Sequence, residues 1–547
     1  MPLFRRRWML LSCLLALSGC GEAEVDPIVL TPSEAAPMDA PFAEPEPVEV
    51  APPARPFPRP AAARPAPPPT PAPDPEELAR AAAERERLAF EREYPWHGVA
   101  YHFLAQVHAR PDERSEVIGY MRRGAQFRAK AGLRGPGCAR GWHGIPGGGF
   151  VCRGGGFQLG DVPQTFDPSP VLAATDNALP YAYAWVARND VPQYWRLPSR
   201  AEEQEVQAWI ERRHRAEERA REAAAAPPEE RRPEPDLEAP PGLGDDAVVE
   251  NVEPADGGVP TPARAAATQE DVQPAVLRMR MQRGFYVSID RLEVSEGRRF
   301  YRTIRGAYVP ADAVVENQPS AMRGVTLGAR WQLPMGFIYR GGVRSLSRAA
   351  VGGTLRLEAP LDRFTALPLS EEVIVRRGQR YRVEDRGRIV REDALRIARA
   401  IPRPAQIPAN ERWVHVNLAE QVLVAYEGDR PVFATMVSTG REGFSTPTGT
   451  FRIASKHVSA TMDDPNAGEE AYSIEDVPWT MYFEGSYALH AAFWHDRFGH
   501  PRSHGCVNLA PTDARWVFMF TTPELPPGLH GMSATRAARG TWVHITQ

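Results

Sequence analysis

The distribution of proline constrains this chain more than any other feature. Residues 21–75 contain 18 of the 56 prolines, and residues 227–274 are again proline-rich, acidic and without hydrophobic periodicity. Proline fixes φ and removes a backbone donor, and such a composition cannot bury a core. We therefore expect a stiff, extended tether over 20–75 and a disordered linker over 227–274, with the folded units between and after them.

The charge balance argues against a polyanionic partner. Lys and Arg total 65 and Asp and Glu total 69, so the net charge is −4. No general positive field surrounds such a protein. We expect no binding to nucleic acid.

The first twenty residues predict export. Arginines at positions 5–7 precede an apolar run from Trp8 to Gly19, which has the length of a signal-peptide core and is too short to span a membrane. The run ends Leu17-Ser18-Gly19-Cys20, which resembles the lipobox of bacterial lipoproteins. The resemblance implies that residues 1–19 are a cleaved signal peptide, that lipid on Cys20 anchors the chain to a membrane, and, with Gly21 next, that the body lies in the periplasm at the outer membrane. An ordinary cleaved signal with an incidental cysteine is the alternative.

The five cysteines divide by their position in an exported chain. Cys13 would leave with the signal peptide and Cys20 would carry lipid. Cys138 and Cys152 lie 14 residues apart in a glycine-rich segment, where a disulfide could close a short loop in an oxidising compartment. Cys506 remains, either buried and inert or kept for chemistry.

Before the linker of residues 227–274, the sequence predicts two charged helices, one on each side of a small β unit. Residues 76–96 form the first charged helix, and the connector of residues 161–226 holds the second from about Ser199. Between them, residues 97–160 alternate in short runs broken by glycine. The Gly-Trp turn and the Gly-Gly-Phe-Val run near their end resemble bacterial SH3-like domains, which implies either wall-peptide binding or a structural spacer.

Residues 275–403 contain an internal similarity. The segment 297–314 aligns without gaps on 378–395, a shift of 81, and seven of eighteen positions are identical. We expect a duplicated small β module with a turn at each shared glycine, and up to three SH3-like units in the chain. Chance similarity between arginine- and glycine-rich segments is the alternative.

The remaining residues, 404–547, carry the strongest motif. A β meander begins at Trp413, and Thr446-Pro447-Thr448-Gly449 forms a turn into another strand. His490 follows, then Ser503-His504-Gly505-Cys506 and Asn508. This arrangement resembles the L,D-transpeptidase catalytic domain of the YkuD type, which implies a β-sandwich with short helices here. The expected fold class is mainly β and multidomain.

The chemistry of the motif predicts a role for each of its residues. A thiol that attacks an amide needs a base, a group that orients the base, and donors for the oxyanion. We predict Cys506 as nucleophile and His490, at a strand end, as base. The resemblance implies that a main-chain carbonyl orients this base. The amides of Gly505 and Cys506 would form the oxyanion hole, with Ser503, His504 and Asn508 shaping the pocket; Trp494, His495 and Tyr482 are candidates for a substrate groove.

A metal site is the main competing interpretation of this segment. Its histidines and Cys506 are dense enough to bind zinc. However, neither a His-Glu-x-x-His nor a Cys-x-x-Cys motif is present, and Gly499 and Pro501 indicate a loop instead of a helix. We expect no metal and no cofactor.

The resemblance implies acyl transfer on peptidoglycan stem peptides. Cys506 would form a thioester with the donor stem and pass it to an amine, as in cell-wall crosslinking. Two alternatives stay open: a hydrolase of the same fold that cuts or trims peptidoglycan, and a non-catalytic scaffold that binds the wall through its SH3-like units.

Overall fold

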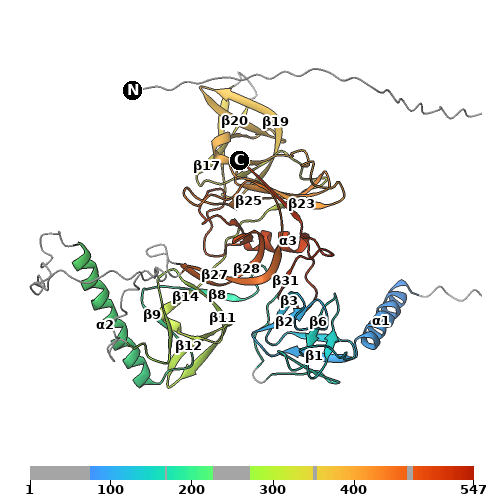
Figure 1. Cartoon of the computed structure of the whole chain (residues 1–547). Coiled ribbons are helices and arrows are strands. Elements are labelled where there is room, and N and C mark those ends of the chain that lie inside the picture. Colours follow the sequence, from blue (N-terminus) through green and yellow to red (C-terminus); the bar gives the residue numbers. More distant parts are fainter. Residues whose placement is uncertain (1–73, 167–168, 226–271, 349–353, 465–471) are drawn as a thin grey trace, which may run out of the picture. The chain divides into compact units, whose positions relative to one another are not determined.

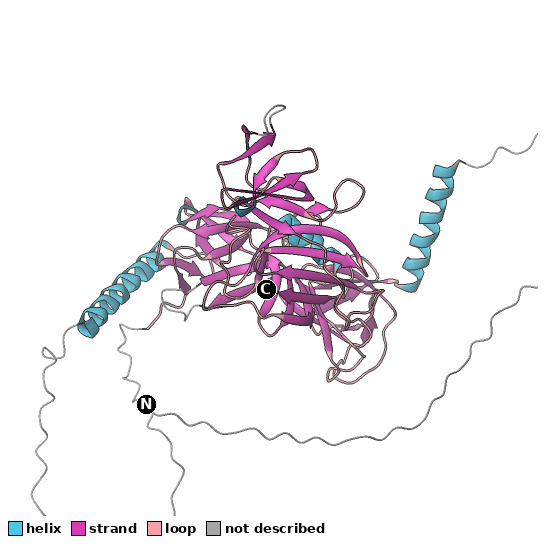
Figure 2. Cartoon of the chain, turned by 90° about the horizontal axis from the view of Figure 1, so that it is seen from above, coloured by secondary structure: helices cyan, strands magenta, loops and turns pink. Residues whose placement is uncertain are grey.

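The computed structural model describes residues 74–166, 169–225, 272–348, 354–464 and 472–547. Several predictions concern residues outside these ranges. They are the signal peptide, the lipid on Cys20, and nearly all of the tether over 20–75 and of the linker over 227–274. Figures 1 and 2 show that strands dominate the described chain and that helices are few. The expected fold class, mainly β and multidomain, is confirmed.

Two charged helices occur where the sequence predicts them. Helix α1 (Pro75–Glu93) begins with Pro75 in its first turn, and the Asp74 carboxylate accepts the Glu76 N–H at 3.0 Å. Helix α2 (Arg200–Ala225) begins with a capping box, in which Ser199 and Glu202 each accept the other's backbone N–H. Described helices include none that is both long and apolar enough to cross a membrane.

Three small β modules share one pairing pattern. In each, the first of seven strands pairs with the fourth and seventh, the second with the third and sixth, and the fifth with the sixth. Module one contains β1 (Trp96–Ala100), β2 (Leu104–His108), β3 (Val117–Arg122), β4 (Gln126–Ala129), β5 (Trp142–Gly144), β6 (Phe150–Cys152) and β7 (Phe157–Gly160). Module two contains β8 (Ala182–Val186), β9 (Val191–Tyr194), β10 (Leu277–Met281), β11 (Tyr286–Ser295), β12 (Arg298–Thr303), β13 (Tyr308–Pro310) and β14 (Val314–Glu316). Module three contains β16 (Met335–Ile338), β17 (Val343–Arg348), β18 (Leu355–Leu361), β19 (Ala366–Arg376), β20 (Gln379–Glu384), β21 (Ile389–Arg391) and β22 (Leu395–Ala398).

Modules two and three have equivalent secondary structure at positions 81 residues apart, as the internal sequence similarity predicts. Strands β12 and β13 and the short 3-10 helix η3 (Ala311–Ala313) correspond to β20, β21 and η4 (Glu392–Ala394) at that shift. The hairpin turns also correspond, because Glu296-Gly297 and Arg377-Gly378 both have positive φ at their two central positions. Such turns match the twist of the flanking strands.

One expected domain boundary is wrong. The connector over 161–226 and the linker were predicted to precede the duplicated module. Instead β8 and β9, inside that connector, pair with β11 and β10. Helix α2 and the proline-rich segment therefore form an insertion between the second and third strands of module two. Sequence pattern does not detect this, because the pairing partners lie 83 to 107 residues apart.

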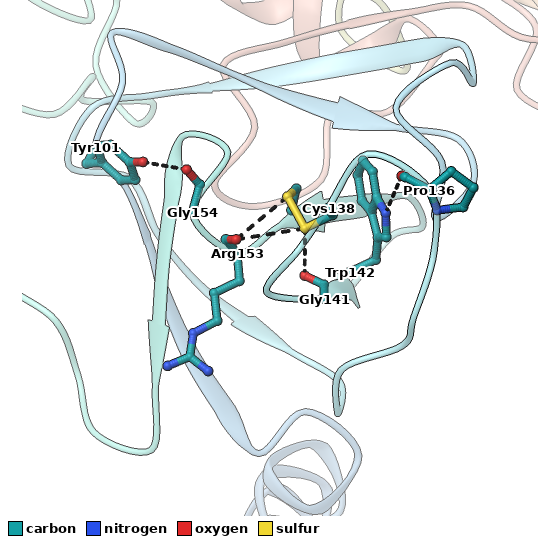
Figure 3. The surroundings of a disulfide bond; sticks show 8 residues. Tyr101, Pro136, Cys138, Gly141, Trp142, Arg153 and Gly154 are labelled. Carbon is teal, nitrogen blue, oxygen red and sulfur yellow. Dashed lines mark hydrogen bonds between the residues drawn. A yellow bond between two sulfur atoms is a disulfide. The ribbon is translucent and has the colours of Figure 1, made fainter.

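Module one contains the disulfide expected between Cys138 and Cys152. Figure 3 shows it beside the Trp142 indole, whose Nε1–H donates to the Pro136 carbonyl at 3.1 Å. The Tyr101 hydroxyl donates to the Gly154 carbonyl at 2.8 Å on the neighbouring turn. The bridge therefore joins the loop before β5 to the end of β6.

The C-terminal domain is built on one long ladder of strands. In spatial order it runs β26, β32, β23, β24, β25, β30, β29, β28, β27, β31, and the pairs β23–β32 and β29–β30 are parallel. Its strands are β23 (Arg412–Asn417), β24 (Val422–Glu427), β25 (Arg430–Ser438), β26 (Gly449–Arg452), β27 (Ser455–Asp464), β28 (Tyr472–Glu484), β29 (Tyr487–Ala491), β30 (Val507–Leu509), β31 (Gly531–Ser533) and β32 (Trp542–Thr546). Helix α3 (Pro511–Phe520) follows β30, and β15 (Val325–Thr326) pairs with β25.

Two hydrophobic clusters share the strands of this ladder. In the first, Val414, Leu423 and Val507 pack with α3 residues such as Val517. In the second, Trp413, Val424 and Phe498 pack with module three residues such as Phe337. Alternating strand residues point to opposite faces. Module three is thus part of the same core as the domain that carries the motif.

Candidate active site

The parallel pair β29–β30 brings the two halves of the motif together. His490 lies one residue before the end of β29 and is in register with Asn508 on β30, while Cys506 immediately precedes β30. Cys506 and His490 both line one cavity of about 1230 Å³. The strands therefore place the predicted nucleophile and base on adjacent backbones, two register positions apart, and both residues line that cavity.

Cys506 is a partly exposed free thiol held in its neutral form. Its Sγ–H donates to the Ser486 carbonyl oxygen at 3.7 Å. Burial by the surrounding protein raises the pKa of the thiol to about 11, and the backbone amide of Ala488 opposes this shift only in part. The resting sulfur needs a base before it can attack.

His490 is buried and uncharged, as a proton acceptor must be. Burial lowers its pKa to about 4, although the hydrogen bond to the Ala491 carbonyl acts in the opposite direction. Its Nδ1 lies 3.1 Å from that carbonyl oxygen, which places the ring proton on Nδ1 and leaves Nε2 with its lone pair. A main-chain carbonyl thus orients the ring, and Trp494 lies nearly parallel to it with ring centroids 5.7 Å apart.

The loop before Cys506 is fixed by hydroxyl groups. Ser503 Oγ donates to the Cys506 carbonyl at 2.5 Å, and the Thr446 hydroxyl donates to the Gly505 carbonyl at 2.7 Å while accepting the Gly440 N–H. Gly505 has φ +114, and a Cβ there would lie 2.3 Å from the Tyr487 ring. The Thr-Pro-x-Gly turn therefore supports the nucleophile loop, and Gly505 is required sterically.

The predicted oxyanion donors differ in availability. The Gly505 N–H donates to Ser503 Oγ at 3.1 Å, so it does not point freely at the cavity in this state. An oxyanion there would require the Cys506 amide, or release of the Ser503 hydroxyl. The assignment of Gly505 as a donor stays a prediction.

The other predicted pocket residues lie in different surroundings. Asn508 is buried, and its side-chain amide lies 3.0 Å from Nε2 of His495. His504 is exposed at the rim, 3.1 Å from the Arg441 guanidinium and stacked on Tyr472. His504 therefore lies at the entrance of the cavity, and Asn508 lies deeper inside it.

Two of the three groove candidates line the cavity. Trp494 and His495 do, whereas Tyr482 is absent from the lining among the described residues. The Tyr482 ring instead packs edge-on against His457, with centroids 5.7 Å apart. Burial, followed by the nearby Cys506, raises the pKa of its phenol. Tyr482 is therefore near the thiol but outside the cavity lining.

The cavity is strongly basic, which the sequence analysis missed. Among the described residues its lining holds five arginines and only one acidic side chain, Asp496. The arginines are Arg340, Arg363, Arg441, Arg497 and Arg502. Arg502 directly precedes the motif, so its position in the sequence could have identified it as a cavity residue. Arg340 and Arg363 belong to module three, more than 100 residues earlier, and no sequence pattern connects them to the motif.

A metal site finds no support in the donor arrangement. Among the described residues, no three His, Cys, Asp or Glu side chains lie together as a metal would require. His490 and His495 use ring nitrogens on the Ala491 carbonyl and on the Arg497 N–H, respectively. Ligation through those nitrogens would break these bonds.

Comparison with known proteins agrees with the geometry. Residues 411–545 match the family model described as the L,D-transpeptidase catalytic domain, YkuD. A Bacillus subtilis protein named "Putative L,D-transpeptidase YciB" is 27% identical in an alignment of 124 residues that covers 19% of this chain and 59% of that protein. The chain thus spans less than two thirds of this relative.

Solved structures of similar proteins include three L,D-transpeptidases. A mutant of an Enterococcus faecium L,D-transpeptidase is 20% identical, covering 25% of this chain and 50% of that one, with a TM-score of 0.20. An L,D-transpeptidase from Stackebrandtia nassauensis is 24% identical over 26% and 58%, with a TM-score of 0.19. One from Mycobacterium smegmatis is 18% identical over 31% and 77%, with a TM-score of 0.21.

Proposed function

We propose that the YkuD L,D-transpeptidase catalytic domain formed by residues 411–545 of this chain transfers peptidoglycan stem peptides through a thioester on Cys506. The observation that carries the proposal is the β29–β30 pair, which brings His490, with Nδ1 held by a carbonyl, and Cys506 to one cavity. A transpeptidase role in general follows from the family; the donor, the acceptor and the residue roles are proposed here.

The first half-reaction needs one proton transfer. As Sγ of Cys506 attacks the donor carbonyl carbon, its proton passes to Nε2 of His490, and a tetrahedral oxyanion forms. The oxyanion collapses, the C–N bond breaks, and the departing amine takes the proton from His490. A thioester and a free terminal amino acid result, with no change of redox state.

The second half-reaction reverses these steps with a new amine. The acceptor attacks the thioester carbonyl and gives its proton to His490, the C–S bond breaks, and the proton returns to the sulfur. If water takes the place of the amine, the product is a shortened stem. The same geometry therefore serves transfer and hydrolysis, and the acceptor decides between them.

The basic lining supports an anionic donor. Five arginines face the cavity against one carboxylate, and Asp496 is itself paired with Arg363 at 3.0 Å. Concentrated positive charge raises the local concentration of anions and orients them. Stem peptides carry several carboxylates, so they fit this chemistry better than neutral or cationic peptides.

Incubation of the full-length protein with a disaccharide tetrapeptide, with and without a D-amino acid acceptor, tests the proposal by mass spectrometry. We expect exchange of the terminal residue, and a loss of at least about 100-fold in Cys506→Ala and His490→Ala. His214→Ala, on the exposed face of α2, serves as the matched control and keeps full activity. Turnover that persists in Cys506→Ala would exclude the mechanism, and tripeptide without exchange product would assign the hydrolytic alternative.

We further propose that the protein is an envelope lipoprotein anchored through Cys20, as its lipobox-like sequence suggests. The SH3-like character of the modules and their binding to the wall belong to the same proposal. Cys20→Ala should move the protein from the membrane to the soluble periplasmic fraction. Unchanged fractionation would contradict the anchor.

A further inference from the structure

One wall of the catalytic cavity is the segment of residues 492–502, here called the active-site loop. It carries Trp494, which lies parallel to the His490 imidazole, and His495, which contacts the Asn508 side chain at 3.0 Å. The loop therefore packs directly on the proposed base. Any displacement of Trp494 changes the orientation and hydration of His490.

Two arginines of module three bind the active-site loop. Arg363 pairs with the Asp496 carboxylate at 3.0 Å, and its guanidinium also donates to the Asp496 main-chain carbonyl. Arg396 Nε donates to the Gly499 carbonyl at 2.7 Å, and its guanidinium lies 4.1 Å from the centre of the Tyr339 ring. Both side chains thus hold loop backbone, which only a planar, multidentate donor does well.

The fit between module three and the loop is close. Gly499 has φ +89, and a Cβ there would lie 2.7 Å from Tyr339 Cβ. Tyr339 meets the His500 ring edge-on, with centroids 4.9 Å apart. Phe498 is completely buried in the cluster that module three shares with the catalytic sheet. The loop therefore has little freedom on this side.

Module two holds the start of the same loop. The Asn317 side chain, which follows β14, donates to the Phe493 carbonyl at 2.8 Å, and the Tyr286 hydroxyl donates to the Trp494 carbonyl at 3.4 Å. The Tyr183 ring stacks on Phe493 at 4.1 Å. Two modules thus fix the backbone on either side of Trp494.

We propose that modules two and three are working parts of the active site, in which Arg363, Arg396 and Asn317 are positioning residues for the active-site loop. The inference rests on the proposed function, because it assigns these residues a role in presenting His490 to Cys506. Its physical basis is preorganisation: a catalytic group held to a fraction of an ångström reacts far faster than one on a free loop.

The test compares full-length variants in the stem-peptide exchange assay. Arg396→Ala should lower kcat about 10- to 100-fold with KM within about threefold, because Arg396 holds the Gly499 carbonyl and does not line the cavity. Arg363→Ala should lower kcat by a similar factor and also raise KM, because it removes one of the five arginines of the cavity as well as the contact with the loop. Arg391→Ala, an exposed arginine of module three paired with Asp393, is the matched control and keeps wild-type kcat. Arg363→Lys should recover part of the loss, since an ammonium can still reach one acceptor.

A second measurement separates this inference from the proposed function. In the full-length protein, the His490 ring resonance, identified by its disappearance in His490→Asn, reports the pKa of the imidazole without any turnover. We expect that pKa to rise toward its ordinary value in Arg363→Ala and Arg396→Ala, as water reaches the ring, and to stay at the wild-type value in Arg391→Ala. If Arg363→Ala and Arg396→Ala both keep the wild-type kcat, the inference is wrong. If the wild-type protein shows no turnover, an unchanged His490 pKa in both variants would contradict it.

Discussion

At the residue scale, the proposed nucleophile and base are both neutral at rest. Burial raises the pKa of Cys506 to about 11 and lowers that of His490 to about 4. A preformed thiolate–imidazolium pair would require the opposite shifts. The proton therefore moves during attack, not before it.

This arrangement predicts an unusual alkylation profile for Cys506. The rate of its reaction with iodoacetamide should rise about tenfold per pH unit from about pH 7 to 9.5, because only the thiolate reacts and its pKa lies above that range. Peptide-resolved mass spectrometry measures the rate, with Cys506→Ala as background. His490→Asn should keep this profile while losing turnover. A rate that is constant across neutral pH would instead indicate an ion pair.

At the element scale, strand β28 joins three parts of the chain through Asp476. Its carboxylate accepts from Arg122 Nη2 on β3 at 2.6 Å, from Ser288 Oγ on β11 at 2.6 Å and from Ser459 Oγ on β27 at 2.9 Å. Burial opposes ionisation of Asp476, but Arg122, Ser288, Arg305 and His530 together lower its pKa. Module one, module two and the catalytic domain thus meet at one ionised side chain.

Breaking this contact from one side should be costly. Arg122→Met leaves a buried carboxylate without its cation, so we expect about 3–5 kcal/mol less stability in urea unfolding followed by tryptophan fluorescence. Arg123→Met, at the neighbouring position, should have almost no effect. The double variant Arg122→Met/Asp476→Leu should be more stable than Arg122→Met alone. Equal stability of Arg122→Met and wild type would show that the ion pair contributes nothing.

At the scale of the whole molecule, buried neutral histidines are concentrated in the catalytic domain. Burial lowers the pKa of five of them well below 6.5: His415, His457 and His490 to about 4, and His495 and His530 to about 3. The unfolded chain binds protons at these sites as the pH falls from about 6.5 to 4, whereas the folded chain does not. Stability must therefore fall as the pH falls through this window.

We expect chemical unfolding midpoints to decrease steadily from about pH 7 to 4.5, with each such histidine contributing about 3 kcal/mol over the full window at ~1.4 kcal/mol per pKa unit. Asp513, whose pKa burial raises to about 6, and Glu475, whose pKa burial also raises, act oppositely but are two groups against five. His415→Phe should reduce the slope of the free energy of unfolding against pH by up to ~1.4 kcal/mol per pH unit, which corresponds to one proton. A midpoint that is flat or rises on acidification would contradict this account.

Much of the architecture was predictable because it is encoded locally. The cap at Asp74 and the box at Ser199 start the two charged helices, and the glycines of the 81-residue repeat mark equivalent turns. The C-terminal fold followed from a specific motif. Where module two begins was not predictable, since β8 and its partner β11 are separated by helix α2 and the proline-rich segment.

The sequence by itself determined the thiol, the imidazole and the turn that supports them, because each belongs to a short motif whose spacing fixes its place on adjacent strands. Only the tertiary structure decided what surrounds them. Arg363 reaches Asp496 across 133 residues and Arg122 reaches Asp476 across 354. Such contacts depend on how folded modules dock, and docking reflects the shape and charge of whole surfaces that no local pattern of residues records.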